Sequence, residues 1–94
     1  MARMGADDLA RVRPVLDQLR ALDALHERTP GTFTAKGAPF LHFHSRATGI
    51  VADLKVGGDW RRYDVERAAG RRVFVRDVRR VLRGVRTGLG GEPT

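Results

Sequence analysis

The sequence lacks cysteine entirely, which excludes disulfide bonds, thiolate metal sites and thiol nucleophiles. It also lacks long apolar runs. The longest, such as residues 49–52, fall far short of the roughly 20 residues that a transmembrane helix needs. The N-terminal residues contain no apolar segment of the signal-peptide type. From these absences we expect a cytoplasmic protein without membrane association.

Lysine is scarce as well, and the basic charge is carried almost wholly by arginine. Sixteen of the eighteen basic residues are arginine, and residues 61–86 hold ten of them against three acidic residues. That segment accounts for the whole formal charge of +7, because the remaining residues hold eight basic and eight acidic side chains. An anion-binding face has this distribution of charge. A GC-rich genome would also favour arginine, so composition alone leaves both interpretations open.

A chain of 94 residues fits one domain. Its hydrophobic content of 41% is ordinary for a globular protein. A chain of this size buries roughly 60–65% of its unfolded surface, which allows one modest core and leaves little room for a deep active site. We expect a single α+β domain over residues 1–87 and a flexible tail, rich in glycine, over residues 88–94.

A helix is predicted over residues 7–27. Its apolar residues recur three or four positions apart, as on one face of a helix. They are Leu9, Val12, Leu16, Leu19, Leu22 and Leu25. Pro14 either kinks this helix or lies in the first turn of a main helix that begins there. Residues 29–31, Thr-Pro-Gly, are expected to end the helix, which places His26 near its C-terminal carbonyl groups.

Four short strands are predicted over residues 32–65, separated by turns at Gly37, at residues 46–49 and at the Gly57–Gly58 pair. A second helix is predicted over residues 73–86, although residues 73–75 could instead be a fifth strand because they are β-branched and aromatic. The expected fold is a two-layer α+β sandwich. In it an antiparallel four-stranded meander is flanked by an N-terminal and a C-terminal helix, in the order α-β-β-β-β-α.

The register of the central hairpin follows from its apolar residues. Pairing Leu41 with Leu54 brings the apolar faces of both strands together, and a shift by one residue would turn every side chain to the wrong face. In this register Phe40, His42 and His44 share the opposite face. The register also places Asp53 directly opposite His42.

The side chains of His42, His44 and Asp53 are therefore metal-ligand candidates. Two imidazoles and one carboxylate suit a divalent metal such as zinc or iron. A cross-strand His–Asp pair is also an ordinary stabilising contact, and Arg62, expected beside Asp53, would compete with a metal for the carboxylate. Both interpretations stay open, with no cofactor as the first expectation.

A second set of candidates is the row of arginines on the final helix. They are Arg76, Arg79, Arg80, Arg83 and Arg86. Such a row can neutralise phosphates and release counterions, which predicts nucleic-acid binding that weakens steeply with salt. No base-reading motif accompanies the arginines, so little sequence preference is expected.

No catalytic motif is present in the sequence. Ser45 follows His44 directly and points to the other face of its strand, and no nucleophile elbow or phosphate-binding loop occurs. The leading functional prediction is a non-enzymatic interaction domain that binds a protein partner or forms a homodimer through exposed strand edges. Nucleic-acid binding and a metal-dependent enzyme or sensor are the alternatives.

The segments PFLHFH, residues 39–44, and GIVADL, residues 49–54, resemble the FLHFH…ADL core of short uncharacterised bacterial proteins. The first segment is also distantly similar to the F-A-H-x-H stretch of the luciferase-like small domains, in which the order helix–meander–helix is comparable. The likeness covers residues 30–65, and the aromatic-rich ending of that family has no counterpart here. The resemblance implies an α+β fold and brings no activity to this chain.

Overall fold

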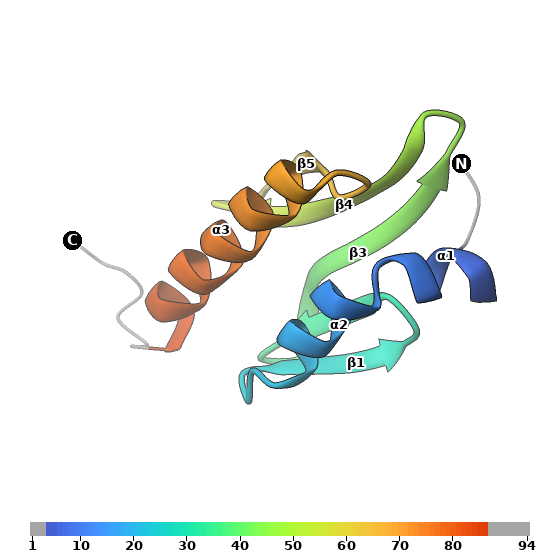
Figure 1. Ribbon diagram of the computed structural model, residues 1–94. Helices are drawn as coiled ribbons and strands as arrows, with labels where there is room; N and C mark the ends of the chain where they lie inside the picture. The colour runs from blue at the N-terminus through green and yellow to red at the C-terminus, as the bar shows by residue number, and fades with distance from the viewer. Residues whose placement is uncertain (1–3, 87–94) are drawn as a thin grey trace.

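The computed structural model describes residues 4–86, in which five strands form one antiparallel sheet with helices at both ends (Figure 1). The elements are, in order, helices α1 (Ala6–Arg11) and α2 (Arg13–Arg20), strands β1 (Leu25–Thr29), β2 (Thr32–Ala35), β3 (Ala38–Arg46), β4 (Gly49–Val56) and β5 (Asp59–Asp64), and helix α3 (Ala68–Arg86). The strands follow one another in sequence order across the sheet. The α+β fold with an antiparallel meander is therefore confirmed, and the predicted number of strands was wrong by one. The predicted tail over residues 88–94 lies outside the described residues.

The extra strand, β1, occupies residues that were expected to be helical. Helix α2 ends at Arg20, and β1 begins only four residues after its C-cap, Ala21. Along β1 the partly buried Leu25 and Glu27 alternate with exposed neighbours, which is the pattern of a half-covered strand. His26 therefore lies on an edge strand and not at a helix C-terminus. Residues 29–31 make the turn to β2, where Gly31 has φ +82°.

The first helical segment is divided in two. Val12, with φ −108° and ψ 14°, breaks the helix between α1 and α2. Pro14 consequently lies in the first turn of α2. Amide groups of the first turn form no hydrogen bond within the helix, so a residue without an amide hydrogen is tolerated there. Of the two predicted roles for Pro14, the start of the main helix is the one observed.

The register of β3 and β4 is the predicted one. Leu41 pairs with Leu54, and His42 pairs with Asp53. Between β2 and β3 the register shifts, so that Phe33 faces Leu41 but Thr34 faces Pro39. The intervening Phe40 is the extra residue of a bulge and is buried in the core. Its predicted place beside the histidines was therefore wrong.

One face of the sheet is covered by the helices, with α2 over β1 and α3 over β4 and β5 (Figure 1). Phe74 of α3 is fully buried there and lies edge-on to Phe43, with ring centroids 5.7 Å apart. Helix α3 begins at Ala68, five residues earlier than predicted, so residues 73–75 are helical and not a strand. Within residues 4–86, no helix has the length and apolar character to cross a membrane.

The first turns of α3 make close contacts with residues 64–66. The guanidinium group of Arg71 donates hydrogen bonds to the carbonyl oxygens of Val65, at 2.7 Å, and Glu66, at 3.2 Å. It therefore holds the connection against the first turn of α3. Gly70 lies so close to the backbone of Asp64 that a β-carbon would come within 1.7 Å of the Asp64 carbonyl oxygen. These contacts fix how near α3 lies to the sheet.

Candidate functional sites

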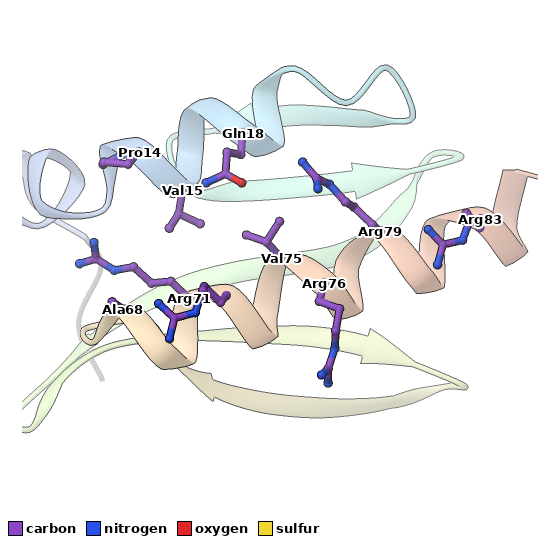
Figure 2. A pocket seen from close by; sticks show the side chains of 10 residues that line it. Pro14, Val15, Gln18, Ala68, Arg71, Val75, Arg76, Arg79 and Arg83 are labelled. Atoms are coloured by element: carbon purple, nitrogen blue, oxygen red, sulfur yellow. The ribbon is translucent and has the colours of Figure 1, made fainter.

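A groove of about 500 Å³ separates α2 from α3 (Figure 2). Its α2 wall consists of Pro14, Val15 and Gln18, and Val75 of α3 adds an apolar patch facing Val15. The remaining lining is dominated by five arginines of α3: Arg71, Arg72, Arg76, Arg79 and Arg83. No carboxylate is among the lining residues. The volume is in the range of small-molecule sites, and the lining favours an anion.

The five arginines differ in how far their charges are already balanced. Arg76 forms an ion pair with Asp77, Nε to Oδ1 at 3.0 Å, and Arg71 is engaged with backbone carbonyl groups. By contrast, Arg72, Arg79 and Arg83 form no ion pair with any carboxylate in the described part of the chain. Three guanidinium groups thus face one groove without a counter-charge.

The sequence-predicted arginines divide between the groove and other places. Arg76, Arg79 and Arg83 line the groove, whereas Arg80 is exposed elsewhere on α3. Arg86 ends α3, but its side chain lies outside the described part of the structure. Arg72 was not among the predicted residues, although it precedes Arg76 by four residues and belongs to the same helical stripe. It was missed because the helix was expected to begin only at residue 73.

A buried network beneath the groove anchors Arg76. The Tyr63 hydroxyl on β5 donates a hydrogen bond to Asp77 Oδ2 at 2.8 Å. Burial would raise the pKa of the Asp77 carboxyl, but the hydrogen bonds from Tyr63 and Arg76 outweigh it and hold the pKa below its usual value. The same burial and the adjacent carboxylate raise the pKa of Tyr63. Asp77 therefore stays ionised and links the sheet to the arginine stripe.

Replacing Tyr63 with phenylalanine is expected to lower the free energy of unfolding by about 1.5–3 kcal/mol. The substitution removes a hydrogen bond to a charged group and leaves one oxygen of Asp77 without its donor. Urea denaturation of the two proteins measures the difference. An unchanged transition midpoint would show that the network contributes nothing to stability.

The groove continues towards the α2–β1 connection. A second hollow of about 290 Å³ has Leu22, Asp23, Ala24 and Leu82 in its lining. Arg79 and Arg83 border both hollows. Arg79 and Arg83 therefore stand where the two hollows meet, and Asp23 supplies the one carboxylate of their combined lining.

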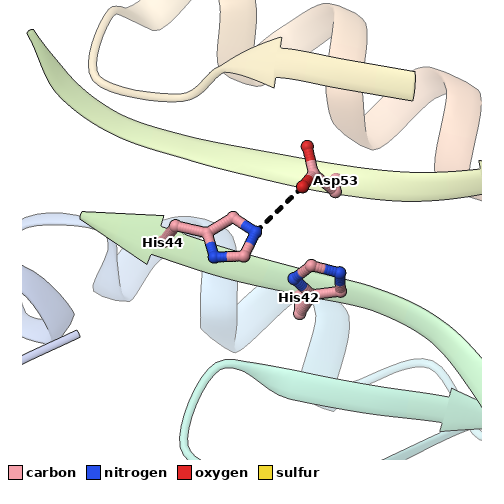
Figure 3. A group of neighbouring side chains, drawn as sticks. All are labelled: His42, His44 and Asp53. Atoms are coloured by element: carbon pink, nitrogen blue, oxygen red, sulfur yellow. Dashed lines mark hydrogen bonds and ion pairs between the residues drawn. The ribbon is translucent and has the colours of Figure 1, made fainter. Parts of the chain in front are cut away.

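The second candidate site lies on the face of the sheet that no helix covers among the described residues. There His42 and His44 of β3 and Asp53 of β4 bring one ligand atom each within 4.8 Å of one another (Figure 3). Although His42 is the direct partner of Asp53 in the ladder, it is His44 whose Nε2 lies 2.8 Å from Asp53 Oδ2. The two imidazole rings lie edge-on to each other, with centroids 4.4 Å apart.

Arg62 of β5 balances the negative charge of Asp53 in this cluster. The Arg62 guanidinium donates to both oxygens of Asp53, at 2.9 and 3.0 Å, as the expected cross-strand pairing required. This hydrogen bonding, first from Arg62 and then from His44, lowers the pKa of Asp53 although burial opposes it. Burial lowers the pKa of His42 as well, assisted by the adjacent His44, so the His42 ring is neutral at pH 7.

Comparisons with known proteins give no match to a family model, to a curated protein or to a solved structure. The resemblance of residues 30–65 to the luciferase-like small domains therefore stays a prediction.

Proposed function

We propose that this chain is a non-enzymatic binding domain that holds the phosphate backbone of nucleic acid in the groove between α2 and α3. One observation carries the proposal: the groove presents three arginines without a counter-charge and is lined by no carboxylate. Guanidinium groups bind phosphate through paired hydrogen bonds, so arginine is well suited to such a surface.

The arrangement of the arginines favours a polymer over a single small anion. Arg72, Arg76, Arg79 and Arg83 follow one another at spacings of three or four residues along α3. Such a stripe spans about 17 Å of helix axis, because each residue adds about 1.5 Å. A row of this length can contact several phosphates of one backbone, whereas one phosphate ion would engage only part of it.

The groove supports backbone binding without sequence preference. Its lining includes no aromatic side chain on which a base could stack. Arginine contacts to phosphate position a protein on nucleic acid, and only contacts to base edges read the sequence. We therefore expect similar affinities for unrelated sequences of the same length.

A protein partner or a second copy, paired through the strand edges, is less well supported. The edge strand β1 has five residues, contains a register shift and is followed by Pro30. The other edge, β5, carries charged side chains along most of its length. Short, irregular and charged edges discourage strand addition.

The triple substitution Arg72→Gln, Arg79→Gln and Arg83→Gln is expected to weaken binding to a short DNA duplex at least about tenfold at low salt. If each arginine contacts one phosphate, the slope of log affinity against log salt concentration becomes shallower by about 3. Fluorescence anisotropy of a labelled duplex of arbitrary sequence, titrated over a series of salt concentrations, measures both effects. A single strand of the same sequence is titrated in parallel.

The matched control removes the same number of charges elsewhere: Arg28→Gln, Lys36→Gln and Arg46→Gln. These residues are exposed and lie outside the groove. If total charge alone governed binding, both triple variants would lose affinity equally, and the groove would have no special role. Absence of binding by the unsubstituted protein at low salt would refute the proposal.

A further inference from the structure

The cluster on the uncovered face of the sheet is separate from the arginine groove, since the groove lies among the helices on the opposite face (Figures 2 and 3). We propose that His42, His44 and Asp53 form a binding site for a divalent transition metal of the zinc type. The inference is independent of nucleic-acid binding, because no residue is shared between the two sites.

The candidate ligand atoms already lie close to the positions that a metal ion requires. A tetrahedral zinc ion with bonds of about 2.0–2.1 Å holds its ligand atoms roughly 3.3 Å apart. The three candidate ligand atoms already lie within 4.8 Å of one another, and His44 Nε2 and Asp53 Oδ2 are only 2.8 Å apart. Small rotations of the side chains are therefore enough to place all three around one ion.

The backbone that carries these side chains is held in place by the core. Strands β3 and β4 are interior strands of the sheet, and their register is fixed on the covered face by the fully buried Leu41 and Leu54. A change of register would separate the ligands, but it would also expose this apolar pair to water. The ligand arrangement is thus a consequence of core packing and does not depend on a flexible loop.

The surroundings of the cluster are those of a partly enclosed site. Asp53 is only 6% exposed, and the side chain of His44 is 18% exposed. Trp60 of β5 packs edge-on against His42, with ring centroids 4.7 Å apart. Two imidazoles and one carboxylate supply three protein ligands. This is the number found in zinc sites that keep a further position for water or another ligand.

Arg62 can remain in place when a metal binds. Its guanidinium contacts both oxygens of Asp53, but a carboxylate has about four lone-pair positions, so a metal can share it with a hydrogen-bond donor. Ligating carboxylates are commonly oriented by such donors. A metal replaces the contact between His44 and Asp53, because both atoms of that contact then bind the ion.

The test is a titration of the purified full-length chain with zinc, followed by competition against a chromogenic chelator. We expect one zinc ion per chain, a rise in the unfolding midpoint on adding zinc, and a visible absorption of tetrahedral type when cobalt replaces zinc. The variants His42→Ala and His44→Ala should each lose affinity about 100-fold, since each removes one of three ligands. His26→Ala is the matched control, because His26 is the third histidine of the chain and lies exposed on β1.

Several results would overturn the inference. If zinc leaves the unfolding midpoint unchanged, it does not bind the folded state, because a ligand that binds only the native state must stabilise it. If all three histidine variants bind zinc as the unsubstituted protein does, the ion is held elsewhere. Circular dichroism of each variant checks that a loss of affinity does not reflect unfolding. Should His42→Ala and His44→Ala both fail to fold, the cobalt absorption decides: its loss in Asp53→Asn, with no change in His26→Ala, supports the site. Its persistence in Asp53→Asn refutes it.

Discussion

Substitution of Gly70 by alanine is expected to lower the free energy of unfolding by more than about 3 kcal/mol, which is beyond the usual cost of overpacking. A β-carbon at this position would lie 1.7 Å from the carbonyl oxygen of Asp64 and 2.9 Å from its carbonyl carbon. Both are backbone atoms, so no side-chain rotation can relieve the overlap. Either α3 or the end of β5 must move away. The better helix propensity of alanine returns only about 1 kcal/mol.

Gly84→Ala is the control for this substitution, because Gly84 belongs to the same helix. Among the described residues, a β-carbon at Gly84 would meet no atom within 4 Å outside the backbone of its own helix, so the free energy of unfolding should stay the same or rise by up to about 1 kcal/mol. Urea denaturation, followed by circular dichroism, measures both variants. Equal midpoints for the two would mean that Gly70 of α3 does not lie against the backbone of Asp64 at the end of β5.

Phe74→Ala is expected to lower the free energy of unfolding by about 3–5 kcal/mol, the usual range for removing a buried aromatic side chain. Phe74 is fully buried, and its ring lies 5.7 Å from that of Phe43 and 5.3 Å from that of Tyr63. The substitution leaves a cavity where α3 meets β3 and β5. The residues around it belong to three different elements and cannot all close on it.

The adjacent Val73→Ala serves as the comparison, because Val73 is 39% exposed on the same turn of α3. The decrease in the free energy of unfolding should be much smaller for Val73→Ala than for Phe74→Ala. Scanning calorimetry or urea denaturation measures both decreases. Should both substitutions cost the same, the aromatic contacts of α3 would not be what holds this helix on the sheet.

The sequence was most informative where one face of a strand is apolar and the other polar. Leu41 and Leu54 could be paired in advance because a one-residue shift exposes both of them, and the position of Asp53 followed from that pairing. The diagonal contact between Asp53 and His44 could not be foreseen in the same way. That contact depends on the side-chain rotamers and on the hydrogen bond that Arg62 of β5 donates to Asp53. The alternation of apolar and polar residues along a strand encodes neither.

The sequence was least informative at the edge of the sheet and at the start of α3. Leu22 and Leu25 are spaced as on a helix, and the polar character of β1 hides its alternation. The first turns of α3 lie against residues 64–66 through the hydrogen bonds of Arg71 and the close approach of Gly70 to Asp64, and hydrophobic periodicity does not reveal such contacts. For this reason Arg72 was missed. The groove itself requires the relative placement of two helices that the whole meander separates in sequence.

That separation has a kinetic consequence. Every pairing in the sheet joins strands that are neighbours in sequence, so the hairpins can form early and independently of the helices. The contact between α2 and α3, by contrast, closes a loop that contains all five strands. We therefore expect the walls of the groove to meet late in folding, after the transition state has formed most of the sheet. An anion that bridges them would slow unfolding while leaving the folding rate almost unchanged.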